Sequence, residues 1–326
     1  MDAVNVDSAY CSPMRIEYHR TLIADQVRIA AFHEALSRSI EKGRTTVADI
    51  GTGTGLLAFL AARLGARKVW AYETAEIGAV AEKLKSLNRM RTVELIPGRS
   101  TEIIEPERAN VVVTETLGNF ALEEFLVETM NDARARHLMP GGVLVPGRVE
   151  QFAAPVTGSR IRDELCAWDR IGYGLDFAPA REMSLNNVYI RTFAPRELLD
   201  EGGSAQCWDR VDFYEKNRLS RRGTVRWPIE RRVTVHGLAV WWTAELVPGV
   251  PLSTSPLGPA THWEQLFFPA LEPIDLVPGD TLVAEIRSRS SEEAGTDMAW
   301  TFAAEGAGRK KVRQRQALSL AKGFLP

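Results

Sequence analysis

The sequence VADIGTGTGLLAFLAARLGARKVWAYE, residues 47–73, decides the fold of this chain. It predicts a buried strand over 47–50, a turn with glycine at every second position, a helix over about 54–64 and a second strand over 68–73. Glycine adopts positive φ and lets a ligand lie against the backbone. The helix that follows presents free N–H groups and the positive end of its dipole. We therefore predict a ligand site at this turn.

Two carboxylates flank the turn and indicate the kind of ligand. Asp49 comes just before the glycines, and Glu73 ends the second strand 22 residues after Gly51. In doubly wound folds a carboxylate at the second position accepts hydrogen bonds from ribose hydroxyls. Leu56 stands where the dinucleotide motif G-x-G-x-x-G requires glycine, and Asp49 suits an amine better than a pyrophosphate. An adenosine-like ligand with a cationic amino-acid end fits both carboxylates, and S-adenosylmethionine is such a ligand.

The composition is that of an ordinary globular protein. A length of 326 residues suits two domains, and a hydrophobic share of 45% is enough for a sizeable core. The net charge of −2 gives no global electrostatic reason to expect nucleic-acid binding.

Cysteine usage and the lack of long apolar runs indicate the compartment. Cys11, Cys166 and Cys207 lie far apart and form no C-x-x-C pair, so neither a disulfide framework nor a zinc site is expected. No apolar run approaches the roughly 20 residues that a membrane span needs. Residues 1–10 lack the basic start and apolar centre of a signal peptide. We therefore expect a soluble, cytoplasmic protein with no membrane partner.

Strands alternate with helices in the first half of the chain. Residues 16–40 carry apolar positions at helical spacing, and buried strands are expected at 92–96 and 110–114. This order predicts an α/β fold with a doubly wound parallel sheet that binds its ligand at the carboxyl ends of the strands. From residue 148 onward apolar residues tend to alternate, which predicts a second, mostly antiparallel β domain. The expected organisation is a helical segment (1–45), a Rossmann-like S-adenosylmethionine-binding domain (46–147), a β domain (148–305) with an insertion at about 162–199, and a basic, poorly ordered tail (306–326).

An acidic loop follows the strand expected at 110–114. Glu115 is predicted at the carboxyl end of that strand, beside the ligand, where a charged group needs a partner. Glu123 and Glu124 follow in the same loop, although acids are also common in the first turn of a helix. Two carboxylates that converge here favour a cation, and a planar guanidinium matches their geometry best.

Three separate motifs now carry a resemblance to a known family. The loop T-E-T-L-G-N-F-A-L-E-E (114–124) resembles the paired-glutamate loop S-E-x-M-G-x-x-L-x-x-E of the protein arginine N-methyltransferases. The stretch Y-H-R-T-L-I-A-D-Q-V-R (18–28) resembles their helix H-x-x-M-L-x-D-x-x-R. The stretch L-S-T-S-P-L-G-P-A-T-H-W (252–263) resembles their loop ending in T-H-W. On these motifs the chain is identified as a member of that family.

The resemblance implies a fold and a set of roles. The family has a cofactor domain followed by a β-barrel, with a helical arm for head-to-tail dimerisation that matches the insertion at 162–199 and predicts a homodimer. Glu115 and Glu124 would grip the substrate guanidinium, and His262, paired with Asp25, would help the released proton away; Trp263 is a further substrate-binding candidate. The cofactor would be S-adenosyl-L-methionine, with S-adenosyl-L-homocysteine as product and no metal. The implied cofactor-binding residues are His19, Arg28, Asp49, Gly51, Thr52, Gly53, Gly55, Glu73, Thr74, Ser100, Thr101 and Glu115.

The chain departs from the family pattern in places. Residues 9–13, A-Y-C-S-P, stand where the family has Y-F-x-x-Y, a helix that folds over the cofactor. Leu117 replaces the usual methionine, and Thr101 replaces a glutamate beside the adenine amine. The predicted acceptor is arginine in a protein or peptide. The alternatives are a small guanidine or modified-arginine metabolite, and a scaffold homologue that transfers no methyl group. A nucleic-acid methyltransferase would want a basic groove with aromatic platforms, and the only basic cluster is the tail.

Overall fold

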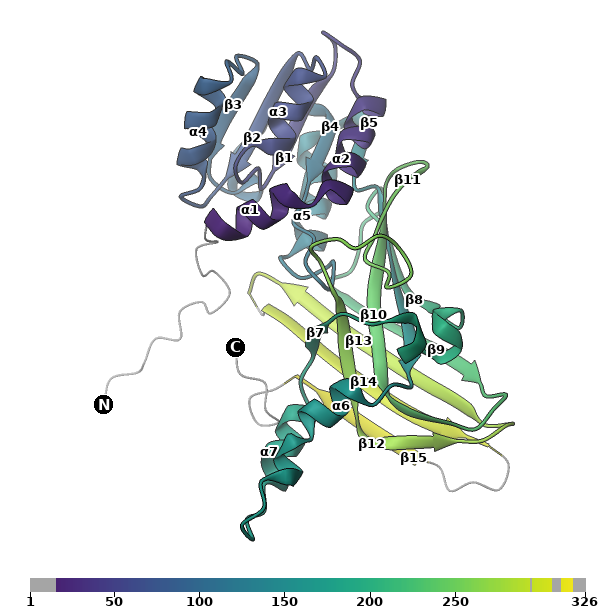
Figure 1. Cartoon of the computed structure of the whole chain (residues 1–326). Helices are drawn as coiled ribbons and strands as arrows, with labels where there is room; N and C mark the ends of the chain where they lie inside the picture. The colour runs from purple at the N-terminus through teal and green to yellow at the C-terminus, as the bar shows by residue number, and fades with distance from the viewer. Residues whose placement is uncertain (1–15, 294, 307–311, 319–326) are drawn as a thin grey trace.

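The computed structural model describes residues 16–293, 295–306 and 312–318. The expected departure at residues 9–13, and Cys11 with it, lies outside the described residues. Figure 1 shows two domains, an α/β domain formed by the first part of the chain and a β domain formed by the rest.

The first domain is built on a parallel sheet with the strand order β3-β2-β1-β4-β5. This confirms the predicted doubly wound α/β fold. The order reverses next to β1, and in such sheets the ligand crevice lies at that point, outside the carboxyl ends of the strands. The strands are β1 (Thr46–Ile50), β2 (Lys68–Glu73), β3 (Val93–Pro97), β4 (Ala109–Thr114) and β5 (Leu138–Val145).

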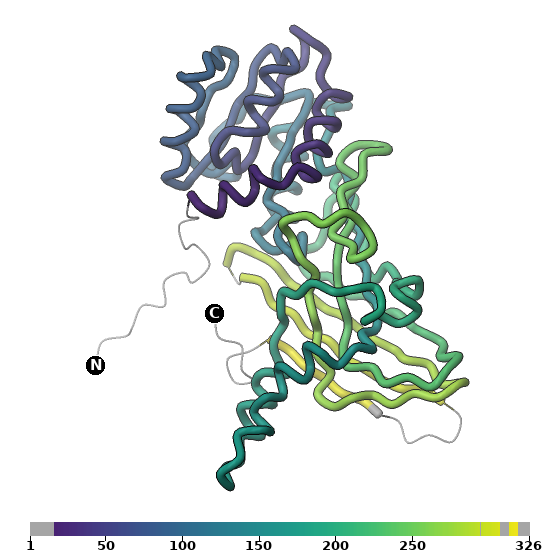
Figure 2. Tube along the Cα trace, viewed as in Figure 1, coloured from purple at the N-terminus to yellow at the C-terminus, as the bar shows by residue number. Residues whose placement is uncertain are grey.

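Helices surround this sheet and precede it in the chain. All five residues of β1 are buried, as a strand between helical layers requires. The pair α1 and α2 breaks at Asp25, whose side chain caps α2, and α1 runs along the end of the sheet that faces the β domain (Figures 1 and 2). The helices are α1 (Ile16–Ala24), α2 (Gln26–Ser39), α3 (Leu56–Arg63), α4 (Gly78–Leu87), α5 (Leu126–Asp132), a short 3₁₀ turn (Ser100–Glu102) and a π-helical turn (Ala133–His137).

The second domain consists of two antiparallel sheets, which confirms the predicted mostly antiparallel β domain. Closure of these sheets into the β-barrel that the resemblance implies stays a prediction. One sheet has the order β7-β12-β10-β6-β8, with β11 paired to β10, and the other has the order β15-β14-β13-β9. The strands are β6 (Arg148–Val156), β7 (Tyr189–Arg191), β8 (Gln206–Asp212), β9 (Ser220–Pro228), β10 (Val233–Val247), β11 (Val250–Ser253), β12 (Gln265–Leu276), β13 (Thr281–Ser291), β14 (Gly295–Glu305) and β15 (Val312–Ala317).

One part of the basic tail, residues 312–317, differs from the expectation. It was expected to be a poorly ordered end, but β15 pairs with β14 along its whole length, from Val312 opposite Ala304 to Ala317 opposite Ala299. The physical reason is that the edge of β14 offers unpaired backbone groups, and Gln316 on β15 is fully buried and donates hydrogen bonds to the Leu185 and Pro269 carbonyls.

The insertion after β6 projects away from both sheets (Figure 2). It holds α6 (Arg160–Leu165), a 3₁₀ turn (Ala167–Arg170) and α7 (Ala178–Leu185). Trp168 stacks on Phe177 at 6.1 Å between ring centroids and closes the tip of the hairpin. Beyond this contact Tyr173 is 96% exposed and Leu175 is 62% exposed. Apolar side chains at the end of a projecting arm indicate a contact surface.

The two domains share a continuous apolar core. Trp242 of β10 is fully buried, and its indole N–H donates to the Gly118 carbonyl in the acidic loop at 3.0 Å. Its neighbour Trp241 is also buried, as the sequence predicted for this pair. The contact means that the second domain supports the loop after β4. Among the described residues, the helices are too short or too polar to cross a membrane.

Candidate functional site

The glycine turn has the backbone that its sequence predicts. Gly51, Gly53 and Gly55 have φ values of 72°, 57° and 89°, the left-handed region that favours glycine. The N–H groups of Gly51 and Thr52 donate to the Tyr72 carbonyl at 3.0 and 2.9 Å, which ties the turn to β2. A Cβ at Gly51 would come within 3.0 Å of the Thr116 methyl group, so the loop after β4 also approaches the turn closely.

Asp49 connects the turn to the start of α3 through hydrogen bonds. One of its oxygens, Oδ2, accepts hydrogen bonds from the Thr52 hydroxyl at 2.5 Å and from the Ala58 N–H at 2.9 Å. The other, Oδ1, is buried and has no hydrogen-bond partner among the described residues. Burial raises the pKa of Asp49 to about 7. Its orphaned oxygen is therefore suited to a donor such as an amine, and contact with a cofactor amine stays a prediction.

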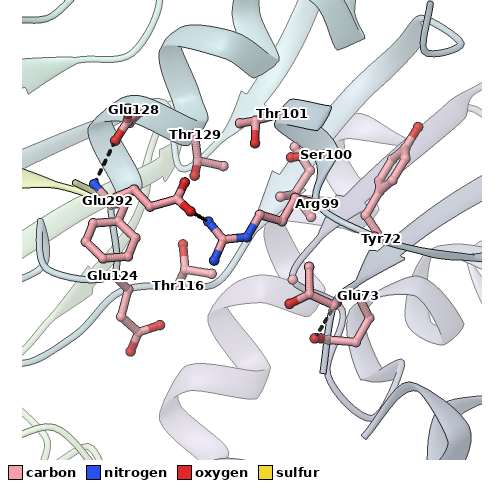
Figure 3. Close-up of a pocket in the computed structure, with 15 residues that line it drawn as sticks. Tyr72, Glu73, Arg99, Ser100, Thr101, Thr116, Glu124, Glu128, Thr129 and Glu292 are labelled. Atoms are coloured by element: carbon pink, nitrogen blue, oxygen red, sulfur yellow. Dashed lines mark hydrogen bonds and ion pairs between the residues drawn. The ribbon is translucent and has the colours of Figure 1, made fainter. Parts of the chain in front are cut away.

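Glu73 lies at the end of β2, between the turn and the next loop. Its Oε2 accepts a hydrogen bond from the Gly53 N–H at 2.7 Å, and its Oε1 accepts from the Thr74 and Ala75 N–H groups at 2.9 and 2.8 Å. These bonds fix the carboxylate at the mouth of the crevice, where Figure 3 shows it. A carboxylate held at this edge is placed to accept further bonds from hydroxyl groups.

A pocket of about 680 Å³, its open mouth included, lies at this edge of the sheet. Six predicted residues line it: Gly51, Glu73, Thr74, Ser100, Thr101 and Glu124. The other lining residues were not predicted: Ile50, Tyr72, Gly98, Arg99, Thr116, Phe125, Glu128, Thr129 and Glu292.

Some of these unpredicted residues could have been found from the sequence. Arg99 adjoins Ser100 after β3, so the carboxyl-end rule reaches it once β3 is recognised. Glu128 and Thr129 lie on the first turns of α5, close in sequence to the acidic loop. Glu292 carries no local signal, because it comes from the second domain and follows β13.

Arg28 and Glu115 form an ion pair beside the pocket. The Arg28 Nε donates to Glu115 Oε2 at 2.7 Å, Nη2 donates to the same oxygen, and Nη1 donates to the Leu22 carbonyl at 3.2 Å. Both side chains are buried. Burial raises the pKa of Glu115, and the charge of Arg28 opposes that rise. The structure thus brings a predicted cofactor residue and a predicted substrate residue into direct contact.

The two glutamates at the end of the acidic loop differ in direction. Glu123 turns back over Gly118, where a Cβ would meet its Oε1 at 1.9 Å, and accepts a hydrogen bond from the Phe120 N–H at 3.1 Å. Glu124 is exposed, lines the pocket and has a φ of 50°, which is costly for a residue with a side chain. Because α5 begins only at Leu126, neither glutamate lies in its first turn.

The carboxyl group of Glu124 has a perturbed acidity. Although the residue is exposed, its carboxyl group lines the pocket, and the protein around the pocket displaces water from it. This loss of water, with repulsion from the charges of Glu115 and Glu123, raises the pKa of Glu124 to about 7. It has no hydrogen-bond or ion-pair partner within the part of the chain that the structure describes. A positive group bound beside Glu124 would offset both effects and lower its pKa again.

Asp25 and His262 meet across 237 residues of sequence. The Asp25 Oδ2 lies 2.8 Å from both the backbone N and the ring Nδ1 of His262, while its Oδ1 accepts from the Arg28 N–H at 2.9 Å. The remaining ring nitrogen, Nε2, has no partner among the described residues. Burial lowers the pKa of His262, in spite of the Asp25 carboxylate. The pairing that the resemblance implies is therefore present.

Trp263 contacts the acidic loop, and His19 contacts the glycine turn. Trp263 is 3% exposed, and its indole N–H donates to the Leu117 carbonyl at 2.7 Å, so it holds the acidic loop from beneath. The predicted contact of Trp263 with substrate stays a prediction. The His19 ring lies 3.3 Å from the position of a Cβ at Gly53, and its buried Nε2 has no partner among the described residues.

Comparisons with known proteins agree with this arrangement. Residues 148–305 match the family described as "Arginine methyltransferase oligomerization subdomain", and residues 32–147 match "Ribosomal protein L11 methyltransferase (PrmA)". Protein arginine N-methyltransferase 6 of Xenopus tropicalis is 30% identical over 263 residues, covering 77% of each chain. Protein arginine N-methyltransferase 1 of Dictyostelium discoideum is 28% identical over 257 residues, covering 76% of this chain and 74% of the relative.

Solved structures share the whole fold. The Trypanosoma brucei PRMT1 enzyme–prozyme heterotetrameric complex with AdoHcy superposes with a TM-score of 0.84 at 23% identity, covering 94% of this chain and 100% of that one. Arabidopsis thaliana protein arginine methyltransferase 10 does so with a TM-score of 0.80 at 23% identity, covering 95% and 99%. By its similarity to curated relatives across both domains, the chain belongs to the protein arginine N-methyltransferase family.

Proposed function

We propose that this protein transfers a methyl group from S-adenosylmethionine to a guanidinium nitrogen of arginine in a protein or peptide. The observation that carries the proposal is the position of Glu115 and Glu124 after β4, next to a pocket whose other wall is the glycine turn and Glu73. The names of the curated relatives point to the same reaction.

The residues of the pocket fit S-adenosylmethionine. The positive φ angles of Gly51 and Gly53 leave room for a ligand against the backbone. Glu73 would hold the ribose hydroxyls. The orphaned Asp49 Oδ1 suits the ligand's amine, and the buried Arg28 guanidinium suits its carboxylate. The pocket is lined by carboxylates, which favours a ligand with a positive sulfonium over a dinucleotide.

The two glutamates account for reactivity toward a guanidinium. The bound cofactor supplies a methyl group on a sulfonium, which is already a good leaving group. A guanidinium is a poor nucleophile because its lone pair is delocalised. Carboxylates at Glu115 and Glu124 would concentrate the positive charge on the nitrogens they contact and leave another nitrogen freer to attack. They would also hold that nitrogen in line, and such positioning supplies much of the rate.

The pair of Asp25 and His262 would take part in removing the proton. With the hydrogen on Nδ1 shared with Asp25, the His262 Nε2 is the basic atom, an assignment that follows from the hydrogen-bond network. Because burial lowers its pKa, the ring is neutral at pH 7 and able to accept a proton. Asp25 would stabilise the imidazolium that forms.

The arm supports a proposal for assembly. The matched family description names an oligomerization subdomain, and this chain belongs to that family. We assign homodimerisation to the arm, whose tip exposes Tyr173 and Leu175. The free thiols of Cys166 and Cys207 support a reducing compartment, and we place the activity in the cytoplasm.

The test is a methyl-transfer assay with isotope-labelled S-adenosylmethionine. An arginine-rich peptide is assayed beside a panel of free guanidines, and the products are identified by mass spectrometry. We expect label in peptide arginine, and the mass shows how many methyl groups are added. Label only in a small guanidine would replace the proposed acceptor by a metabolite. Binding of S-adenosylhomocysteine without any transfer to either class would favour a scaffold.

A further inference from the structure

Arg99 reaches across the pocket to a residue of the other domain. It leaves the loop after β3, extends toward the centre of the pocket in Figure 3, and forms an ion pair with Glu292, which follows β13. The Glu292 N–H donates to Glu128 Oε2 at 3.1 Å, so α5 anchors the backbone of this acidic residue. Among the residues that line the pocket, Glu292 alone comes from the β domain.

The ion pair is poorly placed to stabilise the fold. The Arg99 and Glu292 side chains are 39% and 52% exposed, and exposed pairs contribute little to the free energy of unfolding. Both residues line the pocket and expose part of this surface to it. A ligand in the pocket would cover that surface and remove water from it, which strengthens the contacts of a charged group. The pair is thus better suited to binding than to folding.

The position of Arg99 identifies the part of the ligand it meets. Glu73, the proposed ribose residue, ends β2, and Arg99 follows the adjacent strand β3, flanked by Gly98 and Ser100. Ligands of such sheets lie in the crevice outside the carboxyl ends of the strands, so a nucleoside whose ribose is held at the end of β2 can place its base at the neighbouring end of β3. The planar face of a guanidinium stacks on aromatic rings and is attracted by them.

Resting on the function proposed above, we propose that Arg99 forms a platform for the adenine of the cofactor and that Glu292 is the positioning residue that holds the guanidinium there. The need for such a residue follows from the charges around it. Glu124 and Glu128 line the same pocket and could each attract Arg99. An arginine drawn to Glu124 would leave the base and occupy the carboxylate meant for the acceptor. Glu292 holds it at the adenine end.

The experiment measures binding of S-adenosylhomocysteine by titration calorimetry. We compare the wild-type protein with Glu292→Gln, Arg99→Met, Arg99→Lys and the double variant Glu292→Gln/Arg99→Met. Glu293→Gln is the matched control, since Glu293 is the next residue and an exposed acid that does not line the pocket. Cation–π contacts predict that Glu292→Gln and Arg99→Met each weaken binding about threefold to thirtyfold. Arg99→Lys keeps the positive charge but lacks the planar group, so its affinity should fall between those of the wild type and Arg99→Met.

A second ligand distinguishes the base from the rest of the cofactor. 5′-Methylthioadenosine contains the adenine and ribose but lacks the amino-acid end. Glu292→Gln should weaken its binding by the same factor as that of S-adenosylhomocysteine. Arg28→Lys should weaken only the latter. The melting temperature of Glu292→Gln should equal that of the wild type, because the pair is exposed.

The outcomes separate this inference from the proposed function. Failure of the wild-type protein to bind S-adenosylhomocysteine would count against the function itself. Normal binding by the wild type with unchanged affinity in Glu292→Gln would overturn only the inference. Tighter binding in Glu292→Gln would overturn it as well, because the pair would then obstruct the pocket. A double variant no weaker than Arg99→Met would support it, and additive losses would show that the two residues act separately.

Discussion

Arg28 directs two of its guanidinium nitrogens at a single oxygen of Glu115, a residue 87 positions further along the chain. Both side chains are buried, with 7% and 6% of their surface exposed. The carboxylate proposed to hold the substrate guanidinium is therefore already oriented by a guanidinium of the protein. Its second oxygen, Oε1, lies 3.3 Å from the Leu117 N–H and is the freer of the two.

Replacing Glu115 separates catalysis from cofactor binding. Glu115→Gln keeps the shape but loses the charge, and we expect the rate of methyl transfer to fall about 100-fold or more. The affinity for S-adenosylhomocysteine should change little. The variant also leaves Arg28 buried without a counter-charge, which should lower the free energy of unfolding by about 3 kcal/mol. Kinetics below the melting temperature, calorimetry and denaturant unfolding measure the three effects. Transfer at the parent rate would disprove the clamp.

Glu124 offers a cleaner test because its removal leaves no buried charge behind. Glu124→Gln should raise the KM for the acceptor and lower kcat. The melting temperature at neutral pH should not fall, because the raised pKa means that the Glu124 carboxylate opposes folding there. The control is Glu76→Gln, an exposed acid of the same domain. If both variants behave alike, Glu124 does not contact the acceptor.

The same residue predicts a pH dependence. The pKa of Glu124 is raised to about 7, so the group is neutral below that pH and charged above it. Only the carboxylate pairs with a guanidinium, so kcat/KM for the acceptor should fall as the pH drops through about 7, at most tenfold per pH unit. Measurement of kcat/KM over a series of pH values checks this. The fall on the acid side, the acid limb of the profile, should be absent in Glu124→Gln. A limb retained in that variant would assign it to another group.

Glu73 is expected to control cofactor affinity. Hydrogen bonds to charged groups contribute about 1.5–3 kcal/mol, so Glu73→Ala should weaken binding of S-adenosylhomocysteine about 10-fold to 150-fold. Glu73→Gln keeps one acceptor oxygen for the Gly53 N–H and should have an intermediate effect. Calorimetry measures both. Unchanged affinity in Glu73→Ala would contradict the ribose assignment.

Asp25 joins the start of α2 to the loop that carries His262. Asp25→Ala removes a helix cap and leaves the buried His262 N–H unpaired, which should cost about 2–4 kcal/mol of unfolding free energy. Asp25→Asn keeps an acceptor oxygen and should cost less. Denaturant unfolding with an unchanged m-value checks the comparison. Equal losses in both variants would mean that the charge, and not the hydrogen bonds, matters.

The sign of the pH effect follows from the Asp25 pKa. Burial works to raise it, but hydrogen bonds from the Arg28 and His262 N–H groups outweigh burial, and the pKa falls below its usual 3.8. This stabilisation is present above pH 3.8 and is lost as the pH falls through the lower value of the folded protein. The difference in the free energy of unfolding between Asp25→Asn and the wild type should therefore become smaller in acid.

The arm predicts an effect on assembly. Tyr173→Asp combined with Leu175→Asp places charges on the exposed tip and should convert a dimer into monomers. Light scattering after gel filtration measures the mass. Both side chains are exposed, so the substitutions leave the core of each chain intact. Any fall in the melting temperature should therefore come from the loss of the dimer. A mass equal to wild type would exclude the tip from the interface.

The sequence by itself determined the features that arise from neighbouring residues. The glycine turn after β1, Asp49 before it and Glu73 at the end of β2 follow from local φ preferences and from strand and helix periodicity. The acidic loop after β4 was also placed correctly, because a parallel sheet puts all its carboxyl ends at one edge. The resemblance of two motifs to those of the family predicted the pairing of Asp25 with His262.

Only the tertiary structure decided which side chains meet. Arg99 pairs with Glu292, a residue far away in the sequence. The strand β15 pairs with β14, although no motif in the sequence indicates this pairing. The opposite directions of Glu123 and Glu124 depend on strained φ angles at Glu124 and Phe125, which residue preferences argue against. Such features depend on the burial and charge that the assembled domains create around each residue, and no local pattern in the chain encodes them.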